Sequence, residues 1–309
     1  MICLYVTKQS GLKIFLESNM TRCLVTGHKG YIGAHLYRTL LEAGHEVMGI
    51  DSDDEESGPI QEVLAPGKRG DYLEFNPEVI FHLACWPRVA FSVENPLSTM
   101  INNVIASSVV LDFAKEVGAR RVVYSSSSSV VGNGDGPESP YALQKLTSEI
   151  ETVLYSKLYG IDTVCLRYFN VYSPDQSASG PYATAIANWM EFIRKGKNPF
   201  ITGTGEQRRD MLHVTDAVAA NIFAMNREEN FCGSVYDVGT GDNISLNEIK
   251  DIVIGYYTDI VFDYVEERPG DVMETKANTT GLQEIGWKTK TLIKDGVSEC
   301  FKLLKEHNE

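Results

Sequence analysis

Short apolar runs alternate with amphipathic stretches along most of this chain. From Met20 onward the apolar runs are RCLVTG, HEVMGID, EVIFHLA and RRVVYSS, and the longer amphipathic stretches are YIGAHLYRTLLEAG and LSTMINNVIASSVVLDFAKEVG. Strands that alternate with helical patterns indicate βαβ units, in which helices cover both faces of a parallel sheet. The pattern therefore predicts an α/β fold with a doubly wound parallel sheet over residues 20–171.

The pattern changes after Asn170. Proline, glycine and serine cluster in VYSPDQSASGPY, which predicts a loop, and beyond it short strands such as NPFITG mix with helices such as SLNEIKDIVIGYY. We expect a smaller C-terminal α/β domain over 172–309 that binds the substrate, with some segments packing back on the first domain. One such segment is LHVTDAVAANIFAM. Residues 1–19 precede the pattern and are expected to form an N-terminal extension.

Composition narrows the class of ligand. The net charge of −14 among 309 residues disfavours nucleic acids and anionic membranes as partners and favours a small molecule. The six cysteines show neither a CxxC pair nor the spacing of a metal site, so we expect no metal and a cytoplasmic location. The N-terminal apolar runs are too short for a signal peptide, and no apolar run approaches the ~18 residues of a membrane span.

A glycine-rich motif, TGHKGYIG, follows the first predicted strand and opens a helix. Gly27, Gly30 and Gly33 would allow a sharp turn and a close approach of helix N-terminal amides to a pyrophosphate, as in Rossmann-type folds. Asp51 ends the next strand at the position where a carboxylate binds the adenosine ribose, and it would repel a 2′-phosphate. The motif therefore favours NAD over NADP. The alternatives are an ordinary glycine turn and a carboxylate in an acidic loop.

A tyrosine and a lysine lie one helical turn apart in SPYALQK. Ser139 is placed to cap the helix with Pro140 at its first position, and Tyr141 and Lys145 would share one face. An adjacent ammonium would lower the pKa of the phenol and make it a general base. The alternative is a surface tyrosine beside a solvated lysine. Upstream, the serine run 125–129 begins where a strand ends, and ligands bind at such edges.

Taken together, these motifs resemble the extended short-chain dehydrogenase/reductases, specifically the nucleotide-sugar epimerases and dehydratases. The resemblance runs from Met20 to about Lys305. Besides the motifs above, it rests on GDY at 70–72, HLAC at 82–85, SSSSSVVG, LRYFNVYSP, GTGEQRRD, YDVGTG and ERPGD. The pattern is closest to UDP-glucose and UDP-N-acetylglucosamine 4-epimerases.

The resemblance implies a role for each matching residue. Ser127, Tyr141 and Lys145 would be catalytic. The cofactor would be bound by Gly27, Gly30, Tyr31, Ile32, Gly33, Asp51, Asp71, Tyr72, Leu83, Ala84, Asn102, Ser125, Tyr141, Lys145 and Tyr168, with Asp71 and Tyr72 near adenine. The UDP-sugar would be bound by Ser127, Asn170, Arg209, Arg268 and Thr275, where the two arginines hold the diphosphate. A surface ion pair is the alternative for each arginine, and loop packing is the alternative for Thr275.

The residues that follow the catalytic serine also distinguish the dehydratases from the epimerases of this family. Related dehydratases follow the catalytic serine with an Asp-Glu pair, whereas this chain has Ser128 and Ser129. The resemblance thus implies NAD-dependent C4 inversion of a UDP-hexose, either glucose/galactose or the N-acetylated pair. A nucleotide-sugar dehydratase or reductase and a non-enzymatic NAD-binding module are the alternatives. Val131 and Ser173 depart from the usual tyrosine and glycine. A homodimer through helices 97–117 and 140–158 is expected.

Overall fold

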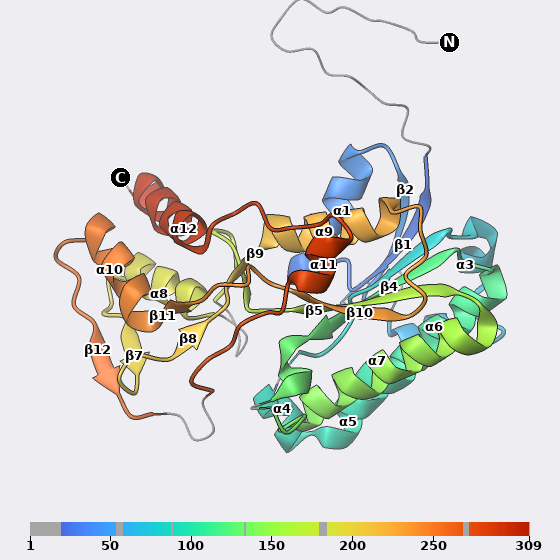
Figure 1. The fold of residues 1–309 in the computed structure, drawn as a ribbon, viewed down its shortest axis with the longest axis horizontal. Helices are drawn as coiled ribbons and strands as arrows, with labels where there is room; N and C mark the ends of the chain where they lie inside the picture. The colour runs from blue at the N-terminus through green and yellow to red at the C-terminus, as the bar shows by residue number, and fades with distance from the viewer. Residues whose placement is uncertain are drawn as a thin grey trace, which may run out of the picture.

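A six-stranded parallel sheet forms the centre of the molecule (Figure 1). The computed structural model describes residues 20–53, 58–87, 89–132, 134–178, 184–267 and 272–308. The strand order is β10-β5-β4-β3-β1-β2. The strands are β1 (Arg22–Thr26), β2 (Glu46–Ile50), β3 (Val79–His82), β4 (Arg121–Ser127), β5 (Asp162–Tyr168) and β10 (Ser234–Val238). The predicted fold class, a Rossmann-type parallel sheet, is confirmed.

The sheet is buried on both faces because its strands are apolar almost throughout. In β1, Cys23 and Val25 pack into one core, and Leu24 packs into the other. This alternation follows from the two-residue period of a strand. The helices over the first face are α1 (Tyr31–Glu42) and α9 (Val214–Asn226), and those over the second include α6 (Ala106–Val117) and α7 (Pro140–Tyr159) (Figure 1).

The order of the strands reverses direction at β1 and β3. β2 lies on one side of β1, whereas β3, β4 and β5 follow on the other. The crossover from β2 to β3 contains α2 (Ile60–Val63) and α3 (Gly70–Phe75), with no strand between them among the residues that the structure describes. Ligands of open α/β sheets bind at such a reversal, outside the carboxyl ends of the strands. Fold topology thus locates the site beyond β1 and β3.

A long interrupted helix follows β3. After α4 (Val89–Glu94) come α5 (Pro96–Met100), a π-helical turn η1 (Ile101–Ile105) and α6. The stretch Pro96–Val117 is apolar and long enough to cross a membrane by length and composition alone. Val110, Leu111 and Phe113 of this stretch are buried in the second core of the sheet. These contacts place part of the stretch in the protein core, whereas Leu97, Ile101 and Ile105 are exposed.

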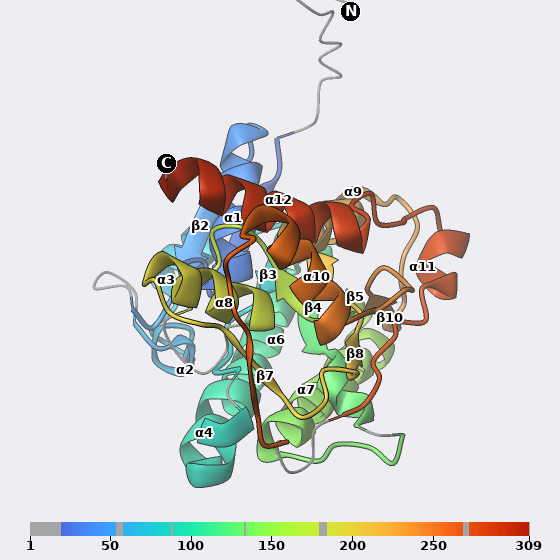
Figure 2. The ribbon, with the colours of Figure 1, turned by 90° about the vertical axis from the view of Figure 1, so that its left-hand side faces the viewer.

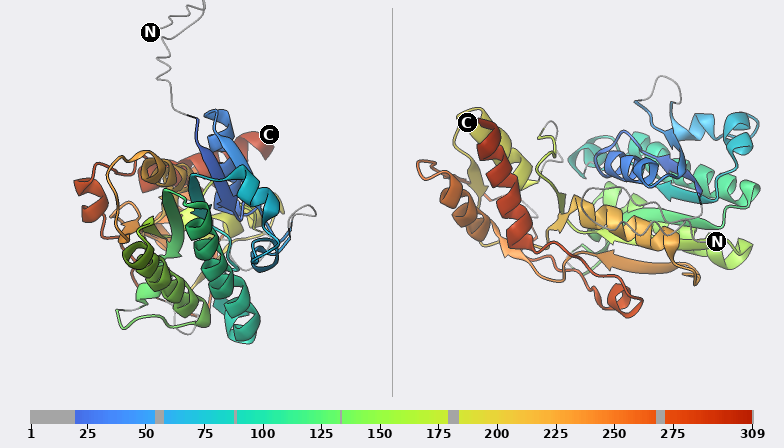
Figure 3. Two further views of the ribbon diagram at one scale, coloured as in Figure 1. Left: turned by 90° about the vertical axis from the view of Figure 1, so that its right-hand side faces the viewer. Right: turned by 90° about the horizontal axis from the view of Figure 1, so that it is seen from above.

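The C-terminal segments form a second lobe beside the sheet (Figure 2; Figure 3, right). Its core contains Ile186, Met190, Ile249, Val253 and Phe301. Its helices are α8 (Ala185–Arg194), α10 (Leu246–Tyr256) and α12 (Ile293–Asn308), and its two-residue or three-residue strands are β7 (Phe200–Thr202), β8 (Arg208–Arg209), β11 (Ile244–Ser245) and β12 (Asp263–Val265). β6 (Val171–Tyr172) pairs with β9 (Leu212–His213) between the lobes, and α11 (Thr280–Glu284) packs against β10.

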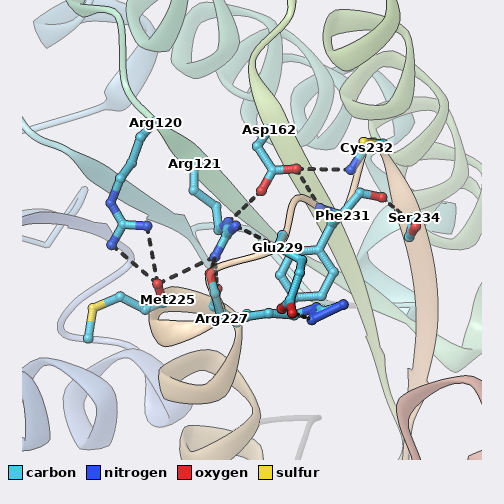
Figure 4. Close-up of polar contacts among 10 residues, drawn as sticks. Arg120, Arg121, Asp162, Met225, Arg227, Glu229, Phe231, Cys232 and Ser234 are labelled. Carbon is cyan, nitrogen blue, oxygen red and sulfur yellow. Dashed lines mark hydrogen bonds and ion pairs between the residues drawn. The ribbon is translucent and has the colours of Figure 1, made fainter. Parts of the chain in front are cut away.

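Two elements from the second half of the chain belong to the first lobe. β10 pairs with β5 at the edge of the sheet, and α9 packs against α1. A buried arginine, Arg121, holds the end of α9 in place: its guanidinium contacts Asp162 at 2.6 Å and the carbonyls of Ala224 and Arg227 at 2.6 Å each (Figure 4). These bonds satisfy carbonyl groups that a helix C-terminus leaves without partners. α9 is thereby fixed against the N-terminal ends of β4 and β5.

Candidate active site

The glycine loop after β1 forms a cradle that only glycine fits. Gly27 has φ +75°, and a Cβ atom there would lie 2.7 Å from the backbone nitrogen of Ala84. A Cβ atom at Gly33 would lie 1.9 Å from the carbonyl oxygen of Gly27. Because both contacts are with backbone, no side chain can be accommodated. The loop therefore packs tightly on β3 and brings the N-terminus of α1 to the cavity, which suits a dinucleotide pyrophosphate.

Asp51 lies next to this cradle at the end of β2. Its carboxylate accepts the backbone N–H of Lys29 at 2.9 Å and that of Asp53 at 3.2 Å. Each carboxylate oxygen has a second lone pair. Asp51 can therefore hold the glycine loop and accept hydrogen bonds from ribose hydroxyls at the same time.

A buried histidine fixes the strand ends beneath the cradle. His82 contacts the hydroxyls of Thr26 at 2.7 Å and Ser107 at 2.8 Å. The Ser107 hydroxyl donates to the carbonyl of Asn103, so it accepts from His82 Nε2–H, and Nδ1 accepts from Thr26. Burial lowers the pKa of His82 to about 3, and the ring is neutral. The neutral histidine ties β1 to β3 at the point where the glycine loop begins.

One cavity of about 1060 Å³ extends from the cradle to the serine run. Most of the predicted cofactor and catalytic residues line it: Gly27, Gly30, Tyr31, Ile32, Gly33, Asp51, Leu83, Ala84, Asn102, Ser125, Ser127, Tyr141, Lys145 and Tyr168. They come from the carboxyl ends of β1 to β5 and from the helices that follow. The cavity is large enough for a dinucleotide and part of a second ligand.

Asp71 and Tyr72 do not belong to this lining among the residues that the structure describes. Both lie on α3, where Asp71 is exposed and Tyr72 packs against the second core of the sheet. Ile60 and Gln61 of α2 line the cavity instead. The crossover from β2 to β3 thus reaches the described cavity lining through α2, and the position of Asp71 and Tyr72 near adenine stays a prediction.

Two of the three catalytic candidates, Ser127 and Tyr141, lie near the end of β4. Ser127 is the last residue of the strand, and Tyr141 lies in the first turn of α7, which is capped by the Ser139 hydroxyl at 3.1 Å from the Ala142 nitrogen. Both residues line the large cavity, where Ser127 lowers the pKa of Tyr141. A sugar hydroxyl placed between them would contact a general base and a hydrogen-bond donor.

Lys145 points elsewhere than the sequence suggests. Its ammonium donates to the carbonyl of Ser125 at 2.6 Å and lies 5.0 Å from the ring centre of Tyr124. The predicted lowering of the Tyr141 pKa by Lys145 is not observed. Burial raises the pKa of Tyr141 well above its ordinary value, charge on Cys85 raises it further, and the hydrogen bond from Ser127 opposes both. Deprotonation of this phenol at neutral pH needs positive charge in the cavity.

An ion pair between α7 and β5 lies next to the serine run. Glu149 of α7 binds Arg167 of β5 with both carboxylate oxygens, at 2.6 and 2.9 Å, and accepts the Ser126 hydroxyl at 2.8 Å. These contacts join α7 to β4 and β5. They fix Tyr141 relative to Ser127, since the two residues lie on the joined elements.

A π-helical turn shapes the opposite wall. Within η1, Asn103 accepts the backbone N–H of Trp86 at 2.8 Å and donates to the side chain of Gln144 at 2.8 Å. Cys85 and Trp86 consequently line the cavity, where burial raises the pKa of the Cys85 thiol and the charge of Lys145 opposes this shift. Neither residue was among the predicted site residues. The signal was that Cys85 ends the HLAC motif and Trp86 follows it directly.

A second cavity of about 210 Å³ adjoins the first. Asn170 lines both, and Arg209, Trp189 and Phe200 line the second together with Asn188, Gln207 and other residues. Arg209 is positioned by its bond to the carbonyl of Arg208 at 2.9 Å. The cavity thus combines aromatic side chains with a guanidinium. Asn188, Trp189 and Gln207 are further residues that the sequence did not single out.

Of the two remaining predicted substrate-binding residues, the structure describes Thr275. Thr275 lines neither of the two cavities among the described residues, and its hydroxyl accepts from the Asn170 amide and from the Asp210 backbone N–H, both at 3.3 Å. It therefore positions Asn170, and its place beside the sugar stays a prediction. Arg268 lies outside the described residues.

Comparison with known proteins decides the family. The model of the NAD dependent epimerase/dehydratase family matches residues 23–239. The chain belongs to this family. Its dependence on NAD agrees with the cradle and with Asp51, and the expected family and cofactor are confirmed. The protein is accordingly an enzyme of the NAD dependent epimerase/dehydratase family.

Members of this family that resemble the chain differ in their reactions. It is 30% identical to a putative UDP-glucose 4-epimerase of Methanocaldococcus jannaschii, with 92% of this chain and 99% of the relative covered. The structure of a UDP-N-acetylglucosamine 4-epimerase from Methanobrevibacter ruminantium, in complex with UDP-N-acetylmuramic acid, matches with TM-score 0.83 and 30% identity, covering 93% and 99% of the chains. A UDP-N-acetyl-alpha-D-glucosaminuronate decarboxylase of Bacillus cytotoxicus is 30% identical over 74% of this chain and 78% of the relative.

Proposed function

We propose that this enzyme inverts C4 of a UDP-hexose through a transient 4-keto sugar, with NAD as a tightly held cofactor. The observation that carries the proposal is the placement of Ser127 and Tyr141 at the wall of one cavity that also contains a dinucleotide cradle. This arrangement suits removal and return of a proton on a secondary alcohol.

Tyr141 acts on the proton and Ser127 on the oxygen. Tyr141 takes the proton of the sugar 4-hydroxyl, and Ser127 donates a hydrogen bond to the C4 oxygen as it becomes a carbonyl. Lys145 orients the nicotinamide ribose. When bound, NAD supplies hydride acceptance and return at C4, and its positive ring lowers the pKa of Tyr141, which burial alone raises.

The second cavity is the proposed site of the nucleotide. Trp189 and Phe200 offer flat apolar surfaces to a pyrimidine base, and Arg209 offers a charged donor to the diphosphate. Asn170 lies where both cavities meet and would bind between diphosphate and sugar. The sugar itself would lie in the larger cavity, so that a firmly held nucleotide leaves the hexose free to rotate between its two faces.

Two sugar pairs fit the proposal, namely UDP-glucose/galactose and the N-acetylated pair. The relatives with 4-epimerase names include one of each kind. A dehydratase or decarboxylase is less well supported, because elimination and decarboxylation in related enzymes use an acidic residue after the catalytic serine. Ser128 and Ser129 occupy those positions here.

We further propose a cytoplasmic homodimer. Apolar side chains are exposed along two helices that lie side by side, α5 to α6 and α7 (Figure 3, left). They are Leu97, Ile101, Ile105, Leu143, Ile150, Leu154 and Leu158. Their spacing of mostly four residues places them in stripes that a second copy would cover.

The test is conversion of defined substrates. The purified protein is incubated with UDP-glucose and with UDP-N-acetylglucosamine in separate reactions without added cofactor, and the sugar product is identified. We expect the C4 epimer from at least one of them. A dehydrated product, or none from either, contradicts the proposal.

The catalytic assignment has its own test. Tyr141→Phe should lose at least about 100-fold in turnover, as removal of a general base does, and keep its NAD content. Cofactor released on denaturation is measured beside the sugar assay. An active Phe variant would sink the assignment of Tyr141 as the base.

A further inference from the structure

Ser129 donates two hydrogen bonds to the catalytic serine, Ser127. The chain leaves β4 at Ser127 and turns into a short 3-10 helix, η2 (Ser128–Val131), for which Ser127 is the N-cap. The backbone N–H of Ser129 donates to the Ser127 Oγ atom at 3.2 Å, and the Ser129 hydroxyl donates to the same atom at 2.9 Å. Both donors approach from the side of η2.

These two bonds fix the direction of any third. A serine hydroxyl has one proton and two acceptor lone pairs. Ser129 occupies both lone pairs of Ser127, so a further hydrogen bond of Ser127 is one that it donates with its own proton. Ser127 is therefore held as a donor toward the reacting atoms.

We propose that Ser129 is a positioning residue that keeps Ser127 a hydrogen-bond donor to the sugar C4 oxygen, beside Tyr141. The inference rests on the proposed function and deepens it. Because Ser127 has no lone pair left for the sugar 4-hydroxyl, that proton goes to Tyr141 in the forward and reverse directions. The two hydroxyl residues then have roles that cannot be exchanged.

Three other ionisable groups near Tyr141 could influence its pKa. Cys85 follows β3, Tyr124 lies within β4, and Lys145 lies one turn farther along α7. None of them is changed by a substitution at Ser129. A difference between Ser129 variants therefore reports the hydrogen bond of Ser127 and not a change of nearby charge.

The variants are Ser129→Ala, Ser129→Thr and, as a matched control, Ser128→Ala. Ser129→Ala removes only the hydroxyl donor, because the backbone N–H at 129 still donates to Ser127. With one lone pair freed, Ser127 can rotate, donate less to the C4 oxygen and lower the pKa of Tyr141 less. We expect kcat to fall about 3- to 30-fold with KM within about twofold, and the acid limb of the kcat profile to move to higher pH by ~0.5–1 unit. Ser129→Thr, which keeps the hydroxyl, should restore both.

A second readout needs no substrate. The NAD-loaded protein is labelled with 13C at the Cζ atoms of tyrosine, and the Tyr141 resonance is identified by its loss in Tyr141→Phe. Ser129→Ala should move this resonance, whereas Ser129→Thr and Ser128→Ala should leave it in place. If the resonance and the pH profile of Ser129→Ala match those of the wild type, or if Ser128→Ala changes them equally, the inference fails. Absence of epimerisation in the wild type would contradict the proposed function and leave the resonance test valid.

Discussion

Asp51 and Asp71 carry the same side chain, and only Asp51 lies in the cofactor cavity. Asp51→Ala removes the acceptor for the Lys29 N–H and for the ribose hydroxyls. We expect NAD to bind about 10- to 100-fold more weakly, since a hydrogen bond to a charged group contributes ~1.5–3 kcal/mol. The relative affinity for NADP should rise, because the charge that repels a 2′-phosphate is gone. Calorimetric titration of protein stripped of cofactor measures both.

Asp71→Ala is the matched control for that experiment. Asp71 is exposed on α3, so its removal should leave the affinity for NAD within about twofold. Equal losses in the two variants would support the predicted adenine site at Asp71. The letters of GDY match the motif, but in the structure they lie on α3, whereas α2 supplies Ile60 and Gln61 to the cavity.

At the level of elements, Arg121 is expected to carry a large share of the stability of α9. Arg121→Met keeps an apolar stem but leaves the carboxylate of Asp162 without its buried ion partner and the carbonyls at the end of α9 without a donor. The free energy of unfolding in urea should fall by about 3–5 kcal/mol. The content of NAD per folded molecule should stay unchanged, because Arg121 begins β4 and Ser127 ends it.

The neighbouring arginine provides the comparison. Arg120 is exposed, and two nitrogens of its guanidinium donate to the Met225 carbonyl at 3.2 Å (Figure 4). Arg120→Met should therefore cost less than about 1 kcal/mol. Similar losses in the two variants would mean that burial of the Arg121 network contributes nothing beyond a surface contact.

The elements themselves followed from the sequence to a large extent, because strand and helix periods are local properties. The glycine loop, the cap by Ser139 and the helix that carries Tyr141 and Lys145 were all readable in this way. Contacts between distant segments were not. The direction of Lys145 toward Ser125, the contact of Asn103 with Trp86 and the Arg121 network each depend on side chains more than 15 residues apart. No periodicity encodes such contacts.

For the whole molecule, the two cavities and the proposed dimer interface lie on different parts of the chain. The residues of the exposed stripes on α5 to α7 are not among the described residues that line these cavities. Large exposed apolar patches are rare on monomeric proteins. Dimerisation should therefore affect stability more than catalysis.

The double variant Ile150→Glu/Leu154→Glu tests this separation. In a two-fold dimer each substitution is repeated on the partner, so four carboxylates would enter an apolar interface, and like charges would be desolvated close together. We expect a monomer by sedimentation equilibrium, with NAD still bound. Leu292→Glu is the control, since Leu292 is 69% exposed before α12 in the other lobe, and it should leave the dimer intact. A double variant that keeps the mass of a dimer, or a wild-type protein that sediments as a monomer, contradicts the proposed interface.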